Sequence, residues 1–280
     1  MPEKVSANQQ IRLLRFERGG TELTAAIRDG DGEPLVLLPG VMADAATWLA
    51  VVDHIDLPNP VVTINRRGRI PSGPLGDRYS IRVEIDDLHR ILDEIEGEVD
   101  LFGWSYGGLI ALETATERQG IRSLITYEPV TSPFAPEAVA PLRDAIEHND
   151  LDRAVEIVNT DVSGFSAEYL ADLRNSPAWP VLRPLAAPLA EELAAINDYR
   201  PRLAKYRHLT MPVTLLLGEL NEDTPPYGTA FAPIAAALPQ AEIVRIPGQG
   251  HLAHAQAPDV LARHIAAAVT AQSMSRPSRS

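Results

Sequence analysis

Ser105 is the first residue whose surroundings predict chemistry. It stands at the centre of segment 103–107, GWSYG, which fits the pattern G-x-S-x-G. The apolar residues 99–102 predict a buried strand before it, and residues 109–119 predict a helix after it. A sharp turn between the two would expose the Ser105 hydroxyl at the carboxyl end of the strand. We therefore interpret Ser105 as a nucleophile, the alternative being a solvated serine in a glycine-rich turn.

A serine hydroxyl needs a base, because it is a poor nucleophile on its own. The chain has seven histidines, and His251 closes the segment 248–251, GQGH, directly after a predicted strand at 242–246. A loop there would hold an imidazole at the carboxyl edge of the sheet, so His251 is the predicted base. The others fall on predicted helices (His54, His89, His264), in a helical segment (His148), before a strand (His208) and at a helix start (His254).

The elements that must position these residues alternate along the chain. Short apolar runs predict strands at 34–38, 61–64, 99–102, 121–127, 213–217 and 242–246, after a hairpin of 11–17 and 22–28. Helical periodicity predicts helices at 45–54, 81–95, 109–119, 231–238 and 258–270. Strands separated by helices predict an α/β fold with a mainly parallel central sheet flanked by helices.

One long segment interrupts this alternation. Residues 131–207 are rich in Ala, Leu and Pro, without β-branched runs, and predict four helices at 136–147, 151–159, 166–174 and 181–196. We expect a helical lid inserted between two strands, with residues 1–130 and 208–280 forming the core. The ends, 1–9 and 271–280, are expected to be frayed.

With strand order, Ser105, the inserted segment and His251 in place, residues 11–270 resemble an α/β-hydrolase with a lid. Segment 37–41, LLPGV, is similar to the oxyanion loop of that family, with Pro39 where the family usually has histidine. The resemblance implies two backbone N–H donors for an oxyanion, those of Val41 and Tyr106, with Met42 as the alternative to Val41. It also implies that the side chains of Met42 and Trp104 line the pocket.

The third catalytic residue is the point at which the sequence departs from the family. Most members have an aspartate after the strand that follows the lid, where this chain has Asn221; a small shift in register could bring Glu222 or Asp223 into its place. Glu128, at the end of strand 121–127, is the other candidate. That position resembles haloalkane dehalogenases and zearalenone-type lactonases, which carry an acid there. We predict Glu128 and keep Asp223 and Glu222 open.

The resemblance implies a cofactor-free hydrolase of carboxylic esters or lactones acting on a small molecule. Trp179, in the lid, is a candidate pocket residue. Thioesterases, carbon–carbon bond hydrolases and perhydrolases use the same residues, and a non-catalytic small-molecule receptor with this fold is the alternative of another class. Segment 65–68, NRRG, takes the place of the family's Asp-x-x-Gly turn. We expect a surface turn there, or an arginine that binds an acid.

Composition and charge disfavour several classes of binding partner and of cellular location. The 280 residues carry a net charge of −13, which disfavours nucleic acid and anionic membranes, and no apolar run is long enough to span a membrane. The chain has no cysteine, and residues 1–10 lack the apolar stretch of a secretory signal, so we expect a cytoplasmic protein. No dinucleotide, P-loop or metal-spaced motif is present, so no metal or cofactor is expected. The sequence leaves the oligomeric state open.

Overall fold

A computed structural model describes residues 11–275, and the side chains up to residue 271; the polar segment 1–10 and residues 276–280 lie outside it. It contains an eight-stranded sheet in the order β1-β2-β4-β3-β5-β6-β7-β8. The strands are β1 (Ile11–Arg18), β2 (Thr21–Arg28), β3 (Leu35–Leu38), β4 (Val61–Asn65), β5 (Val99–Trp104), β6 (Ile121–Tyr127), β7 (Val213–Gly218) and β8 (Glu242–Ile246).

Six of these strands run parallel, and the N-terminal hairpin provides the exceptions. Strand β2 pairs antiparallel with both β1 and β4, whereas β4, β3, β5, β6, β7 and β8 pair parallel. Strands β3 to β7 are almost entirely buried, because helices cover both faces of the sheet. The predicted fold class is therefore confirmed.

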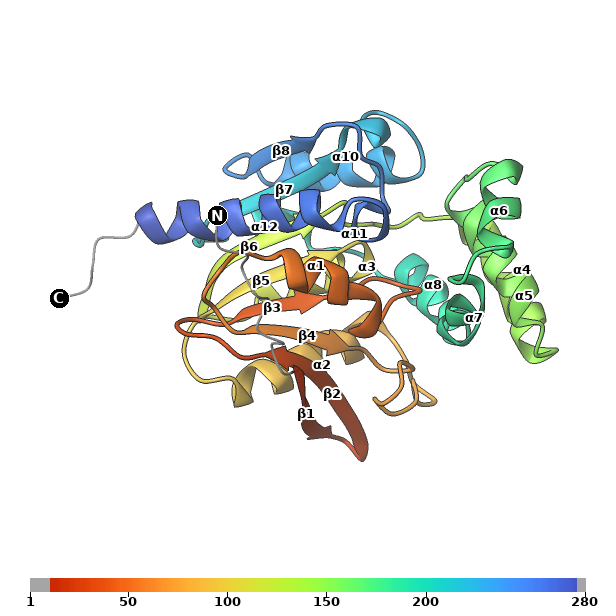
Figure 1. The fold of residues 1–280 in the computed structure, drawn as a ribbon, viewed down its shortest axis with the longest axis horizontal. Helices are drawn as coiled ribbons and strands as arrows, with labels where there is room; N and C mark the ends of the chain where they lie inside the picture. The colour runs from red at the N-terminus through yellow and green to blue at the C-terminus, as the bar shows by residue number, and fades with distance from the viewer. Residues whose placement is uncertain (1–10, 276–280) are drawn as a thin grey trace, which may run out of the picture.

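Two layers of helices sandwich the sheet (Figure 1). One face carries α1 (Leu49–His54), α11 (Ala253–Gln256) and α12 (Pro258–Ser275), after the short 3-10 helix η1 (Ala46–Trp48). The other carries α2 (Ile81–Glu94), α3 (Tyr106–Ala115) and α10 (Tyr227–Ala237). Alternate residues of β3 divide between the two cores, with Leu35 and Leu37 on one side and Val36 and Leu38 on the other. Helix α12 continues to Ser275, so the expected fraying from residue 271 is wrong for residues 271–275.

The chain between β6 and β7 is helical and projects beyond one end of the strands (Figure 1). It contains η2 (Pro136–Ala138), α4 (Val139–Glu147), α5 (Leu151–Ile157), π-helix η3 (Val158–Val162), α6 (Ala167–Arg174), α7 (Trp179–Ala186), α8 (Leu189–Asp198) and α9 (Leu203–Tyr206). The single helix predicted at 181–196 is wrong. Two helices form instead, with Pro188 at the N-cap of α8, because proline cannot donate the backbone hydrogen bond that would continue α7.

The carboxyl ends of the parallel strands meet at one edge of the sheet. Residues that follow β3, β5, β6, β7 and β8 are therefore brought together there, and in open α/β sheets this edge is where ligands bind. Among the described residues, no helix is both long and apolar enough to cross a membrane.

Candidate active site

Ser105 occupies the turn between β5 and α3. Its φ of 56° and ψ of −119° are unfavourable for a residue with a side chain, and such strain costs on the order of 1–3 kcal/mol. The turn is tight enough to require glycine nearby: a Cβ on Gly107 would come within 2.1 Å of the Leu38 carbonyl oxygen. Ser105 is only 4% exposed, and its backbone N–H donates to the Tyr127 carbonyl at 2.9 Å. This geometry agrees with the strained strand-to-helix turn that the sequence predicts around Ser105.

The loop after β3 runs beside Ser105. A Cβ on Gly40 would lie 2.9 Å from the Ser105 Cβ, so the loop backbone passes in direct contact with the serine. The next residues, Val41 and Met42, line the same cavity as Ser105. On the other side of the serine, Tyr106 is the first residue of α3, where N–H groups lack intrahelical acceptors. The structure thus places both predicted N–H donors, those of Val41 and Tyr106, in residues adjacent to Ser105 or lining its cavity.

His251 and Glu128 form a hydrogen bond across the same edge. The His251 Nδ1 lies 2.6 Å from the Glu128 Oε2, and the two side chains are 4% and 0% exposed. A carboxylate only accepts, so Nδ1 carries the proton and Nε2 is left free to accept one. The His251 loop is held in place by two side chains. Trp104 donates from its Nε1 to the His251 carbonyl at 3.1 Å, and the Tyr127 hydroxyl donates to the Gly250 carbonyl.

Glu128 is buried, and its carboxylate oxygens accept hydrogen bonds from groups other than His251. The Gly218 N–H donates to its Oε1 at 2.8 Å, and the Asn221 Nδ2 lies 2.9 Å from Oε1 and 2.8 Å from Oε2. A buried carboxylate needs such donors, since burial without them is expensive. Asn221 ends the short helix η4 (Glu219–Asn221), at the position where most members of the family have an aspartate. Its amide donates to Glu128, which follows the neighbouring strand β6.

The two rival carboxylates lie elsewhere. Glu222 accepts from the Arg245 Nε at 2.7 Å, and Asp223 is exposed in a turn with φ of 57°. The structure therefore places Glu128, and neither of these, against His251.

Tyr227 was not singled out from the sequence, yet it covers His251. The two rings stack with centroids 3.5 Å apart and planes 10° apart, and the Tyr227 hydroxyl bonds to the Ser163 Oγ at 2.9 Å. Burial lowers the pKa of His251 below its ordinary value, while Glu128 opposes this shift. His251 is therefore held neutral under conditions in which an exposed histidine would begin to protonate.

An apolar cavity of about 170 Å³ opens at Ser105 and His251. Its walls come from the core and from the inserted segment, and they include Val41, Met42, Trp104, Phe134, Val158, Asn159, Val162, Phe165, Leu182, Tyr227 and His254. His254 is stacked on Trp48 with planes 4° apart, and burial lowers its pKa to about 3, so it is a neutral wall residue. Two of the three expected pocket residues, Met42 and Trp104, line this cavity.

Trp179 does not line this cavity, so the expectation for this residue needs correction. Its indole Nε1 donates to the Asp152 Oδ1 at 2.6 Å, and Arg174 lies over its ring. Trp179 thus packs within the inserted segment, and its neighbours Ala178 and Leu182 face the cavity instead.

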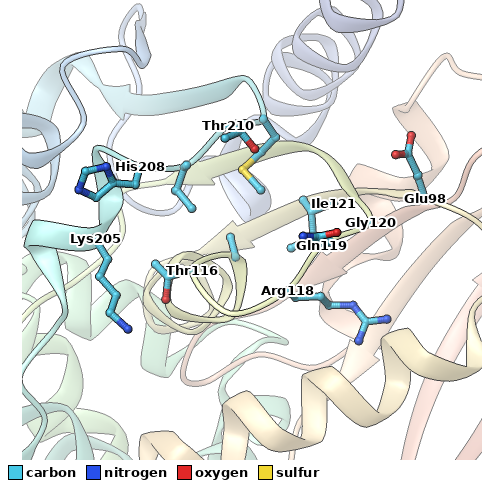
Figure 2. Close-up of a pocket in the computed structure, with 12 residues that line it drawn as sticks. Glu98, Thr116, Arg118, Gln119, Gly120, Ile121, Lys205, His208 and Thr210 are labelled. Atoms are coloured by element: carbon cyan, nitrogen blue, oxygen red, sulfur yellow. The ribbon is translucent and has the colours of Figure 1, made fainter.

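A second cavity, of about 510 Å³, lies at the opposite, amino edge of the sheet (Figure 2). It is bounded by residues at the starts of β5 and β6 and by α9, and Figure 2 shows Lys205 and His208 on one side and Glu98 on the other. None of Ser105, Glu128 and His251 lines it. Within residues 11–275, no group of three or more His, Asp or Glu side chains is placed to hold a metal ion.

The arginine-rich turn after β4 differs from the expected surface turn. Arg66, Arg67 and Arg69 are 2%, 6% and 0% exposed, and each pairs with a carboxylate. The alternative expectation, an arginine that binds an acid, describes this turn, although the acids belong to the protein itself.

Residues 35–264 match the profile of a family described as the alpha/beta hydrolase family. The chain belongs to the alpha/beta hydrolase family. The match includes Ser105, Glu128 and His251 together with the inserted helices, so the resemblance inferred from the sequence is confirmed at the level of the family.

Individual relatives of this alpha/beta hydrolase are distant. A pimeloyl-[acyl-carrier protein] methyl ester esterase of Aliivibrio salmonicida is 26% identical over 69% of this chain and 76% of its own length. The polyketide synthase ThaQ of Burkholderia thailandensis is 26% identical over 88% of this chain, which spans only 12% of that protein. A crystal structure of an alpha/beta hydrolase from Sphaerobacter thermophilus superposes with a TM-score of 0.78, at 24% identity, over 92% of this chain and all of the other.

Proposed function

We propose that this alpha/beta hydrolase cleaves a carboxylic ester or lactone of a small, largely apolar molecule through an acyl-enzyme, without a cofactor. One observation carries the proposal: the hydrogen bond of 2.6 Å between the His251 Nδ1 and the Glu128 Oε2 lies beside an apolar cavity that Ser105 and His251 both border. The Glu128 bond fixes the imidazole tautomer that accepts a proton at Nε2. The esterase among the relatives supports the choice of an ester.

The proposed reaction has two halves. The Ser105 Oγ attacks the carbonyl carbon while its proton passes to the His251 Nε2, and the oxyanion is bound by the Val41 and Tyr106 N–H groups. His251 then gives that proton to the leaving alkoxide as the carbon–oxygen bond breaks. In the second half a water molecule loses its proton to His251 and attacks the acyl carbon, and the proton returns to Ser105 as the carboxylic acid leaves. Glu128 stabilises the imidazolium in both halves.

The inserted helices, residues 131–207, serve in this proposal as a lid. They supply Phe134, Val158, Val162 and Leu182 to the cavity walls, so the insertion would select the substrate while the core performs the chemistry. The small volume and apolar walls favour a compact acyl or alkyl group in this site.

The test compares wild type with Ser105→Ala on p-nitrophenyl butyrate, a simple lactone and a butyryl thioester. We expect kcat on the preferred substrate to fall about 10⁶-fold, the size of effect seen when a serine hydrolase loses its nucleophile. A serine-directed phosphonate should label wild type once and Ser105→Ala not at all. Ser132→Ala is the matched control, because Ser132 bonds only outside the cavity, to the Tyr199 carbonyl and the Arg200 side chain. Absence of turnover and of labelling in wild type would favour the small-molecule receptor instead.

A further inference from the structure

Four buried charged side chains form a cluster beside the loop after β3. Arg66 lies 2.8 Å from Glu84 and 2.6 Å from Glu192, and Arg69 lies 2.7 Å from Glu192. None of the four is more than 2% exposed at its side chain, and two positive charges balance two negative ones. Burying four charges costs desolvation free energy. We therefore consider what the cluster does beside the candidate site.

The two arginines hold the backbone of that loop. The Arg66 Nε donates to the Pro39 carbonyl at 2.9 Å and its Nη2 to the Gly40 carbonyl at 2.8 Å, while the Arg69 Nε donates to the Ala43 carbonyl at 3.3 Å. In a trans peptide the N–H points opposite to the carbonyl of the same unit. With the Gly40 carbonyl fixed on Arg66, the Val41 N–H is therefore turned away from the arginine.

The same cluster also touches the residue that supplies the other donor. The Arg66 guanidinium lies 4.8 Å from the centre of the Tyr106 ring, and the Tyr79 hydroxyl bridges Glu84, at 2.6 Å, and the Tyr106 hydroxyl, at 3.1 Å. The residues whose N–H groups are the proposed oxyanion donors are thus held by one set of charges. The fourth charge, Glu192, comes from α8 in the inserted segment, far along the chain.

We propose that Arg66 is a positioning residue for the oxyanion loop, and that Glu192 lets the inserted segment hold Arg66 and Arg69 in place. The inference rests on the proposed function and adds a role for the insertion beyond forming a wall of the cavity. The segment 39–43 has no strand partner to fix it, so the guanidinium contacts set the direction of the Val41 N–H. A shift of about 1 Å at such a donor is enough to cost on the order of 100-fold in rate.

The test replaces Glu192 with glutamine, which keeps the shape and removes the charge. We expect Glu192→Gln to lower kcat about 10- to 100-fold with KM changed less than about twofold, because one displaced oxyanion donor accounts for up to 10²–10³. The affinity for butyl boronic acid, which adds to Ser105 as a tetrahedral oxyanion, should fall by the same factor. Glu191→Gln is the matched control, since Glu191 is on the same helix but exposed and paired with Arg143. It should behave as wild type.

A second variant keeps the proposal testable if Glu192→Gln does not fold. Arg66→Lys keeps the charge beside both glutamates, but a single ammonium group cannot reproduce the fork that holds both carbonyls, so kcat should again fall with KM preserved. Folding is checked by circular dichroism and thermal melting, and phosphonate titration counts the reactive Ser105. Wild type that fails to label would reject the proposed function itself. Labelled, folded variants with wild-type kcat, a change in KM alone, or two variants that both fail to fold would reject the positioning role.

Discussion

The ends of β6 and β7 lie side by side, but only the end of β6 supplies a carboxylate to His251. The two strands pair in parallel, with Tyr127 opposite Leu216; one continues into Glu128, and the other leads to Asn221. The carboxylate meets His251, and the amide binds both oxygens of that carboxylate. Because the two strand ends are adjacent, we expect that a carboxylate from either strand could place a negative charge beside the imidazole.

The largest effect in this comparison is expected from Glu128→Gln. It keeps the side-chain shape but removes the charge that stabilises the imidazolium, and the corresponding change in a Ser-His-Asp enzyme costs about 10⁴ in kcat. Steady-state kinetics on p-nitrophenyl butyrate measure it, with thermal melting to verify the fold. A loss below about tenfold would remove Glu128 from the proposed mechanism.

Moving the charge to the other strand should recover part of that loss. In Glu128→Gln with Asn221→Asp, the new carboxylate stands where the amide now lies, 2.8–2.9 Å from the group at position 128. We expect kcat to rise about 10- to 100-fold over Glu128→Gln alone, since much of the electrostatic stabilisation returns with imperfect geometry. Asn221→Asp in the wild-type background is the control, and there two adjacent carboxylates should lower activity. Equal rates for the single and double variants would show that the two strand ends are not interchangeable.

The fall of kcat/KM at low pH tests the pairing of His251 with Glu128, and we expect a smaller effect there. His251 acts as a base only when neutral, so kcat/KM should fall as the pH drops through its pKa. Burial lowers that pKa, and the midpoint should lie below the ordinary imidazole value of about 6.5. Because Glu128 raises the pKa of His251, Glu128→Gln should move the midpoint to still lower pH. A midpoint above about 7 in wild type, or a shift to higher pH in the variant, would contradict this environment.

The smallest effects are expected from the two carboxylates that follow Asn221. Glu222→Gln and Asp223→Asn should each change kcat/KM less than about twofold, because Glu222 pairs with Arg245 and Asp223 is exposed. The same ester assay measures both. A loss of 10²-fold or more in either variant would mean that the loop rearranges to bring a different acid to His251.

The sequence predicted the parallel sheet and the positions of Ser105 and His251 because these depend on local signals. Apolar runs of strand length and glycine-rich turns can each be recognised from a few consecutive residues. Glu128 was also open to prediction, because a carboxylate at the end of an apolar strand requires a partner.

The remaining features depend on contacts between distant parts of the chain, which periodicity does not record. Asn221 was interpreted as a missing acid, and only the structure shows that its amide binds Glu128. Tyr227 gave no signal because it follows two prolines and reaches His251 across the sheet edge. The burial of Arg66 and Arg69 depends on Glu192, more than 120 positions later, so the turn resembled an ordinary charged surface segment.

The position of Glu128 has a consequence for how such a protein can diversify. Ser105 and Glu128 belong to one compact β–α–β unit, from β5 to the end of β6, and the long insertion begins only after both. Had the acid followed β7, every change in the length of the insertion would change the separation of nucleophile and acid along the chain. Here a change in the length of the insertion leaves that unit contiguous, and of the three residues only His251 lies beyond the insertion. An exchanged insertion would still have to supply an acid in the place of Glu192, because Arg66 and Arg69 both pair with that residue.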